Sequence, residues 1–431
     1  MLLISLLLAC TPEVATVAPD LGRQATVAPD AHDGLCVSTL LDRGDADRRA
    51  AQVAALQALG VRQIRQDLRW SYVQPARDTW DWATEDAVQD AVMEGGFGEI
   101  AMLGYGVPWA TSQEGADSFT PPDDPADFAA FAAAAAERYS GRDIVWEIWN
   151  EPNAGYRFWK VGDPPALSGD PVAYAALFVA AADAIHAVDS GAEVLVGGTF
   201  WLPQVIPGTV EFLEAALDAE PRFLEVADGV AIHPYTLYPP HVGPEEEEGA
   251  EVALDLMIAL TREVTGHLPL VITEMGWPSW GEVSEQDQAD FLVREFALAQ
   301  AEGIRDVCAY TLEDGDSPED NPEEAFGLVR HGLEELKPSG EAWGALSVHL
   351  QAGAWWECYG RAEVALDLPS GVYAVRWASR RDAMTAVWTT EGELEVTLPP
   401  LSTEEEPTPV TVTAGPTPVF VPQIGDQLVE G

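Results

Sequence analysis

Residues 143–153 read DIVWEIWNEPN. The first seven residues are rich in Ile, Val and Trp, which is typical of a buried strand. The run stops at Asn150-Glu151-Pro152, and Pro152 cannot donate a hydrogen bond to a sheet ladder, so we expect the strand to end there. The segment therefore places an amide and a carboxylate at the carboxyl end of a strand, the edge at which α/β folds bind their ligands.

Short apolar runs alternate with Ala-rich amphipathic stretches on both sides of this segment. Eight such pairs over about 320 residues predict a (β/α)₈ barrel, the TIM barrel of the α/β class. No Gly-rich phosphate loop follows the first run, which argues against an open doubly wound sheet. We predict strands at 34–40, 61–67, 99–105, 143–149, 193–198, 229–235, 270–275 and 306–312, and helices at 46–59, 83–95, 125–139, 171–188, 209–218, 246–265, 284–302 and 338–350. Asp45 is expected to cap the first helix, and Ser284 with Asp287 to form a capping box on the seventh.

The pattern changes after residue 350. Short β-type runs separated by turns occur at 363–371, 372–379, 383–390, 392–400, 409–415 and 417–422. They predict a small antiparallel β-domain, a sandwich, that packs against the barrel. The predicted domains are therefore a catalytic barrel at 33–350 and a C-terminal β-domain at 351–431. Carbohydrate binding by the second domain is an open alternative.

The N-terminal residues read MLLISLLLAC. The apolar run is too short to span a bilayer, but residues 1–10 resemble a bacterial lipoprotein signal that is cut before Cys10, which is then lipidated. No Lys or Arg precedes the run, unlike in an ordinary export signal. Residues 11–32 carry ATVAPD twice and predict a flexible linker. We expect an exported bacterial lipoprotein on the cell surface or the periplasmic membrane, or otherwise a secreted protein; the alternative is an apolar terminus without function.

The formal net charge is −50, from 22 Lys and Arg against 72 Asp and Glu. This charge disfavours nucleic acid and anionic lipid as partners, so membrane contact is expected only through the lipid anchor. It also disfavours polyanionic substrates, unless the cleft gathers the few arginines. We expect a monomer. We also expect no metal or other cofactor, because no two histidines stand at i, i+4 spacing and there is no C-x-x-C motif.

Two cysteines test the predicted fold. Cys36 and Cys308 lie in the first and eighth predicted strands, which are neighbours only if the sheet closes. With Cys10 lipidated, three cysteines remain, and an odd number cannot all pair within one chain. We interpret Cys36 and Cys308 as two buried thiols rather than a disulfide.

A second carboxylate stands at a strand end, because the seventh run, VITEMGWPS, delivers Glu274. Two carboxylates that face each other across a barrel mouth are what glycoside hydrolysis requires. Glu147 has the same strand parity as Glu151 but lies about 13 Å deeper, so we interpret it as a polar residue of an inner layer. Aromatic residues just past strand ends can stack on a sugar, with core packing as the alternative; these are Trp70, Trp109 and Trp277.

The motifs WEIWNEPN, VITEMGWPS and IHPY, with GVRQIRQDLRWSYVQPARDTWDW, resemble those of clan-A glycoside hydrolases. Over residues 33–350 the chain is most similar to family 39 and related enzymes that cut bacterial exopolysaccharides. The resemblance implies that Glu151 is the general acid/base and Glu274 the nucleophile, with retention of configuration. It also implies that Asn150 holds the sugar 2-hydroxyl.

The same resemblance assigns supporting roles. Tyr235 would hydrogen-bond Glu274, while His233 and Arg65 would line the same subsite. Arg65 would lower the pKa of the nucleophile by its positive charge. Relatives often carry a Trp at the end of the eighth strand, where this chain has Tyr310.

The expected function is that of a retaining β-glycosidase that hydrolyses neutral extracellular glycans by double displacement. In such an enzyme the two carboxyl groups lie about 5–5.5 Å apart. The acid needs a raised pKa, to which Trp146 and Trp149 can contribute. Two alternatives remain: a transglycosidase that remodels a glycan, and a catalytically inactive barrel that binds sugar.

Overall fold

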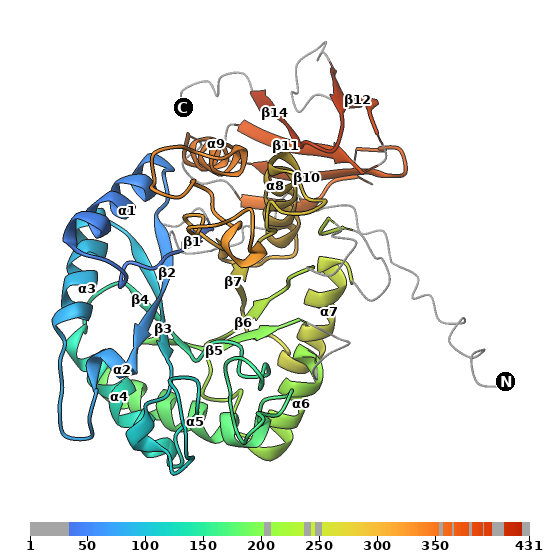
Figure 1. The fold of residues 1–431 in the computed structure, drawn as a ribbon. Helices are drawn as coiled ribbons and strands as arrows, with labels where there is room; N and C mark the ends of the chain where they lie inside the picture. The colour runs from blue at the N-terminus through green and yellow to red at the C-terminus, as the bar shows by residue number, and fades with distance from the viewer. Residues whose placement is uncertain are drawn as a thin grey trace, which may run out of the picture. The chain divides into compact units, whose positions relative to one another are not determined.

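Eight parallel strands close into a barrel in the computed structural model of the chain (Figure 1). Each strand pairs with its sequence neighbours, and β1 also pairs with β8 through Cys36 and Cys308. The predicted closed barrel is therefore confirmed. The strands are β1 (Leu35–Ser38), β2 (Gln63–Arg69), β3 (Gly98–Gly104), β4 (Ile144–Ile148), β5 (Glu193–Phe200), β6 (Gly229–His233), β7 (Leu270–Met275) and β8 (Val307–Ala309).

The structure describes residues 34–201, 208–236, 243–245, 252–352, 357–363, 366–378, 382–390, 392–398 and 409–424. Cys10 and the predicted signal and linker lie outside these residues, as does the stretch 246–251 of one predicted helix. The chain divides into a unit of residues 1–31 and a unit of residues 32–431. Both the barrel and the C-terminal sheets belong to the second unit.

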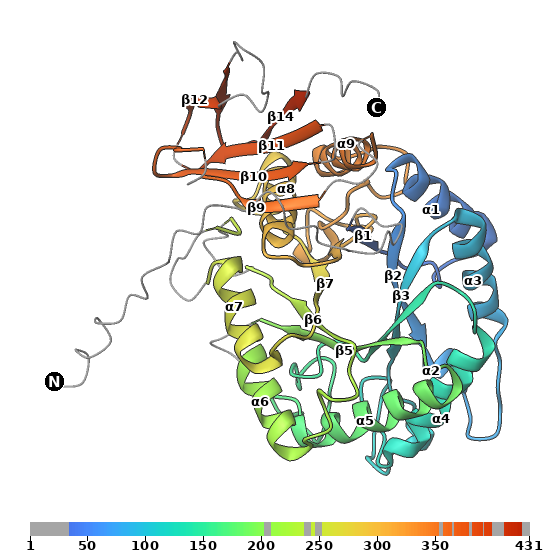
Figure 2. The ribbon, with the colours of Figure 1, turned by 180° about the vertical axis from the view of Figure 1, so that it is seen from behind.

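Helices follow the strands and form the outer ring of the barrel (Figures 1 and 2). Asp45 caps α1 by accepting a hydrogen bond from the backbone N–H of Arg48, as predicted. The capping box of Ser284 and Asp287 is also present. The helices of the ring are α1 (Ala46–Ala58), α3 (Ala83–Gly95), α4 (Pro125–Arg138), α5 (Pro171–Val188), α6 (Thr209–Ala219), α7 (Leu254–Thr265), α8 (Glu285–Ala301) and α9 (Pro338–Ala352), with the short α2 (Trp70–Val73), η1 (Pro108–Ala110) and η2 (Pro322–Glu324) in loops.

One described helix, α5, is long and apolar enough to cross a membrane by length and composition. Its apolar composition has another explanation, because it packs between α4 and α6 and buries Tyr174 and Phe178. Helices that pack in the core of a protein can have the same length and composition.

Cys36 and Cys308 form a disulfide inside the barrel. The prediction of two free thiols is wrong. The parallel register sets the two residues directly opposite each other, with their Cα atoms 4.0 Å apart, which the sequence pattern did not reveal. The bridge lies in a small buried cluster with Ile100, Leu195 and Val271. It joins the first strand to the last and so closes the barrel covalently.

Two antiparallel sheets follow the barrel. The larger has the order β14-β11-β10-β9 and the smaller pairs β12 with β13. Buried side chains of both sheets share one cluster that includes Ala374, Val387, Val396 and Leu398, which agrees with the predicted small β-domain. The strands are β9 (Glu357–Arg361), β10 (Val372–Ala378), β11 (Asp382–Thr389), β12 (Leu394–Leu398), β13 (Val410–Ala414) and β14 (Val419–Ile424).

One strand of this domain was predicted in the wrong place. The run 363–371 is not a strand in its described residues, and β9 precedes it at 357–361. The described residues of 363–371 lie mostly in turns, and Leu366 among them is buried in the cluster shared by the two sheets. Trp377 belongs to the same buried cluster as Phe296 of α8 and Trp343 of α9, so the domain packs on the helices that follow β7 and β8.

Candidate active site

The chain turns sharply at the end of β4. Trp149 and Glu151 have positive φ angles of 70° and 44°, a backbone conformation that residues other than Gly rarely adopt. Such conformations cost on the order of 1–3 kcal/mol and cluster at functional sites. The backbone N–H of Glu151 donates to the carbonyl oxygen of Gly198 at 2.8 Å, which holds the turn against β5. The strained turn sets the Glu151 side chain over the barrel mouth.

Two glycines of β5 make this turn possible. A Cβ on Gly197 would lie 2.2 Å from the carbonyl oxygen of Trp149, and one on Gly198 would lie 2.1 Å from Nε2 of His233. Real Cβ atoms do not approach that closely, so both positions require glycine. The GG pair in the predicted strand EVLVGG therefore leaves room for the β4 turn and the His233 ring.

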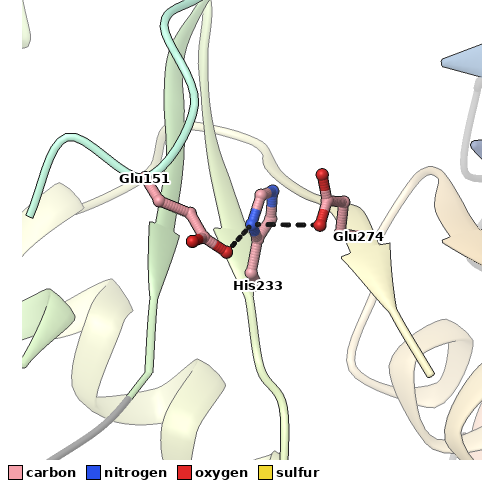
Figure 3. A group of neighbouring side chains, drawn as sticks. All are labelled: Glu151, His233 and Glu274. Carbon is pink, nitrogen blue, oxygen red and sulfur yellow. Dashed lines mark hydrogen bonds and ion pairs between the residues drawn. The ribbon is translucent and has the colours of Figure 1, made fainter. Parts of the chain in front are cut away.

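The side chains of Glu151, His233 and Glu274 lie together, with the His233 ring between the two carboxylates (Figure 3). They follow β4, end β6 and lie within β7 respectively. Nδ1 of His233 is 2.9 Å from Oε1 of Glu151 and 3.8 Å from Oε2 of Glu274. One oxygen from each carboxylate and a ring nitrogen of His233 all lie within 4.8 Å of one another. The carboxylates are thus close neighbours across the mouth.

Arg65 of β2 connects three acceptors from other strands. Its guanidinium donates from Nε to Oε2 of Glu147 at 2.6 Å and from Nη1 to Oε1 of Glu274 at 2.5 Å. Its Nη2 donates to Oδ1 of Asn150 at 2.8 Å. The predicted contact of Tyr235 with Glu274 is present, with Oη donating to Oε2 at 3.1 Å. Glu147 is fully buried, as expected for a polar residue of an inner layer.

The two candidate catalytic carboxyls have opposite pKa shifts. Burial raises the pKa of Glu151, and the neighbouring Glu274 adds to the rise, although His233 opposes it. Burial acts in the same direction on Glu274, but there the charges of His233 and Arg65 and the Tyr235 hydrogen bond outweigh it and lower the pKa. At a pH between the two values, Glu151 holds a proton while Glu274 is ionised.

His233 connects Glu151 to a chain of buried polar groups. Thr273 donates from Oγ1 to Glu147 at 3.0 Å, so its oxygen accepts from Nε2 of His233, also at 3.0 Å. Nδ1 of His233 lies 2.9 Å from Oε1 of Glu151. The chain Glu147–Thr273–His233 therefore fixes the imidazole ring against the Glu151 carboxyl group.

A cavity of about 230 Å³ opens above these groups. The predicted site residues that line it are Arg65, Asn150, Glu151, Tyr235, Glu274 and Tyr310. His233 is fully buried beneath it and contacts two residues of its wall, Glu151 and Glu274. The structure brings these seven predicted residues together, while their catalytic and binding roles stay predictions.

The three tryptophans predicted at the rim do not line this cavity. Trp70 is fully buried and stacks on Phe131. Trp109 is half-buried, and its ring lies beneath the guanidinium of Arg77. Trp277 is buried and donates from Nε1 to Thr236. The expectation that they project into the cleft is wrong, because the chain bends after each strand and turns these rings into the packing behind the rim.

The cavity is also lined by residues that were not among the predicted site residues. Phe158 and Phe326 supply aromatic faces, and Arg43 and Arg157 supply charge. Asp67 lies two residues beyond Arg65 on β2, so strand alternation could have placed it on the same face. Burial raises the pKa of Asp67 to about 6, although Arg69 and Arg65 oppose the rise.

Several buried acceptors in the cavity wall lack a hydrogen-bond partner among the described residues. They are Oγ1 of Thr39, Oε1 of Gln66 and Oε2 of Glu151. Buried polar atoms in native proteins are nearly always paired. The wall therefore suits a ligand that is rich in hydroxyl donors.

Glu151, His233 and Glu274 are also the one group of described residues with the spacing of metal ligands. Two observations argue against a cation there. The guanidinium of Arg65 already neutralises Glu274, and the pKa of Glu151 is raised, whereas a metal ligand must be ionised.

No family model matches the chain, and no curated protein matches it. Solved structures share its fold. One is a family 39 glycoside hydrolase from Bacteroides cellulosilyticus WH2, at 20% identity over 91% of this chain and 81% of that chain, with a TM-score of 0.70. Another is a monomeric β-xylosidase from Caulobacter crescentus CB15, at 17% identity over 91% and 94% of the two chains, with a TM-score of 0.59. A GH39 enzyme from Xanthomonas axonopodis pv. citri matches at 20% identity over 82% and 71%, with a TM-score of 0.57. At these identities the likeness establishes the fold.

Proposed function

We propose that the chain is a retaining β-glycosidase with Glu151 as general acid/base and Glu274 as nucleophile. One observation carries this proposal: a buried and a largely buried carboxyl at the barrel mouth, with oxygens within 4.8 Å of each other, have pKa values shifted in opposite directions. Such a pair is how one site supplies an acid and a nucleophile together. The fold shared with glycoside hydrolases, one of them a β-xylosidase, supports the same reaction.

The reaction has two steps. Glu274 attacks the anomeric carbon while the bond to the leaving oxygen breaks and Glu151 gives that oxygen its proton. Glu151, now ionised, removes a proton from a water molecule, which attacks the same carbon and releases Glu274. Close spacing of the carboxyls favours this course over inversion, in which a water must fit between groups about 6.5–9.5 Å apart.

The remaining site residues hold the sugar and prepare Glu274. Asn150 is fixed by Arg65, so that its amide can donate to the 2-hydroxyl. Tyr235 and Arg65 each donate to one oxygen of Glu274 and keep it ionised. The unpaired acceptors of Thr39 and Gln66 would bind other hydroxyls of the sugar.

A panel of β-linked substrates tests the proposal. We would assay the chain from residue 33 on glucan, xylan and mannan and on 4-nitrophenyl β-glycosides, with Glu274→Gln beside the wild type. The expected result is release of reducing ends by the wild type and a loss of at least about 10³-fold in the variant. Longer products in place of free reducing ends would indicate a transglycosidase, and binding without turnover by the wild type an inactive sugar-binding barrel.

We further propose that the protein is exported, anchored through Cys10 and monomeric, and that its substrate is an extracellular glycan. The disulfide between Cys36 and Cys308 supports export, because such bonds persist mainly in oxidising compartments. Radiolabelled palmitate should enter the wild type expressed in a bacterial host and not Cys10→Ser. Equal labelling of both proteins would refute the anchor.

A further inference from the structure

A second cavity, of about 690 Å³, adjoins the catalytic one. The two cavities share Leu40, Arg43 and Thr311 in their walls. The second cavity extends away from them between the loop that follows β1, the first turns of α1 and the loop that follows β8. A ligand in the catalytic cavity can therefore continue into the second one past Arg43.

The wall of the second cavity offers hydrogen-bonding groups without a full set of partners. Gln52 is only 5% exposed, and its Oε1 has no hydrogen-bond partner among the described residues. Arg43 is exposed, and within the described part of the chain its side chain makes no ion pair. Asp316 is highly exposed, and among the described residues its carboxylate forms an ion pair with the His331 ring, at 3.2 Å. The wall is strongly polar, with carboxylates, the amide of Gln52 and the guanidinium of Arg43, and such groups can accept from and donate to the hydroxyls of a sugar.

The position of the second cavity shows which part of a substrate it would hold. It lies beside β8 and β1, next to β7, which carries Glu274. Glu151 follows β4, on the opposite side of the closed barrel. The leaving group departs on the side of the acid that protonates it, toward Arg157 and Phe158 of the loop that follows β4. A sugar in the second cavity therefore belongs to the part of the substrate that stays bonded to Glu274.

We propose that the second cavity is a subsite for a second sugar unit on the non-departing side, with Gln52 and Asp316 as its acceptors. This inference rests on the proposed glycosidase activity and deepens it. The substrate is then an oligosaccharide or polysaccharide with neutral, hydroxyl-rich units. The enzyme releases disaccharides or longer products rather than single terminal sugars.

Matched chromogenic substrates test the inference. We would compare 4-nitrophenyl β-D-glucoside with the β-cellobioside, and the β-D-xyloside with the β-xylobioside, measuring nitrophenol and separating the sugar products. The expected result is a kcat/KM at least about tenfold higher for the disaccharide of the active pair, with intact disaccharide as the first product. An equal or higher kcat/KM for the monosaccharide, with single sugars as products, would overturn the subsite and leave the glycosidase standing. Silence of both pairs and of the polysaccharide panel would refute the glycosidase and the subsite together.

Two variants localise the effect to the second cavity. Gln52→Leu removes the unpaired acceptor at nearly constant volume, and Asp316→Ala removes the exposed one. Each should lower kcat/KM for the disaccharide about five- to tenfold and leave the monosaccharide within twofold. Glu319→Ala is the matched control, because this exposed acid of the same loop lines neither cavity. Asp316→Ala changes an exposed side chain and does not disturb the core, so it tests the inference even if Gln52→Leu folds poorly. Equal losses of kcat/KM on both substrates, or no loss on the disaccharide, would contradict the inference.

Discussion

Nη1 of Arg65 lies 2.5 Å from Oε1 of Glu274, and both groups are deep in the barrel mouth. The same guanidinium also contacts Glu147 and Asn150, so a single cation of β2 links residues of β4 and β7. Burial alone would raise the pKa of Glu274, yet that pKa is lowered, with Arg65 among the causes. Glu274 is thus kept ionised in a place where an isolated carboxylate would take up a proton.

Arg65→Gln should raise the pKa of Glu274, because the variant loses the positive charge beside it. An opposite charge at this distance shifts a carboxyl by about 1–3 pKa units. Glu274 must be ionised to attack, so the acidic limb of the pH profile of kcat/KM should move to higher pH, with at least tenfold less activity at pH 5. An acidic limb that stays in place while activity falls would show that Arg65 only maintains the structure.

Glu151→Gln should separate substrates by their leaving groups. The amide cannot donate the acid proton, so disaccharides and alkyl glycosides should lose about 10²–10⁴-fold in kcat/KM. Nitrophenyl glycosides need little protonation and should lose far less in their first step, which a burst of nitrophenol in stopped-flow would reveal. The basic limb of the pH profile should also disappear. Equal losses on both classes of substrate would remove Glu151 from the role of acid.

Gly198→Ala should disturb the site without touching a charged group. A Cβ there would lie 2.1 Å from Nε2 of His233, far inside van der Waals contact, so the ring must shift from its position beside Glu151. We expect kcat to fall at least tenfold while the protein still folds. Gly344→Ala on α9 is the matched control, since its Cβ would find its nearest neighbour at 3.8 Å. Unchanged kcat in Gly198→Ala would mean that the position of His233 does not matter.

Cys36→Ala with Cys308→Ala should destabilise the barrel. The two residues are 272 positions apart in the chain, so the bridge restricts a very long loop in the unfolded state. The free energy of unfolding should fall by about 2–5 kcal/mol, measured by denaturation in urea. A reducing agent should lower the stability of the wild type and leave the double variant unchanged. Equal stability of the two proteins would contradict the presence of the bridge.

Glu85 should make stability depend on pH. Burial raises the pKa of this fully buried carboxyl from its usual 4.5 to about 8, and Asp42 adds to the rise. The folded state then binds a proton that the unfolded state releases above pH 4.5, so this contribution to stability is present below pH 4.5 and is lost as the pH rises to about 8. The loss should be on the order of 5 kcal/mol. In Glu85→Gln the urea midpoint should depend much less on pH across this window. An equally steep decline of the midpoint with pH in the variant would assign the pH dependence to other groups.

The sequence by itself determined the barrel and the two acids. Alternation of apolar runs with amphipathic stretches depends only on local periodicity, and every predicted strand of the barrel overlaps an observed one. Asn150, Glu151 and Glu274 could be placed at the mouth because parallel strands in a closed barrel all end at one edge. Tyr235 and Arg65 followed from the resemblance of short motifs.

Only the tertiary structure decided the contacts that depend on register and on the path of loops. Cys36 and Cys308 pair because β1 and β8 align at those two residues, which no local pattern specifies. Trp70, Trp109 and Trp277 turn away from the mouth because the loops after their strands fold back on the helices. The opposite pKa shifts of Glu151 and Glu274 arise from burial and from charges on other strands, and these exist only once the barrel has closed.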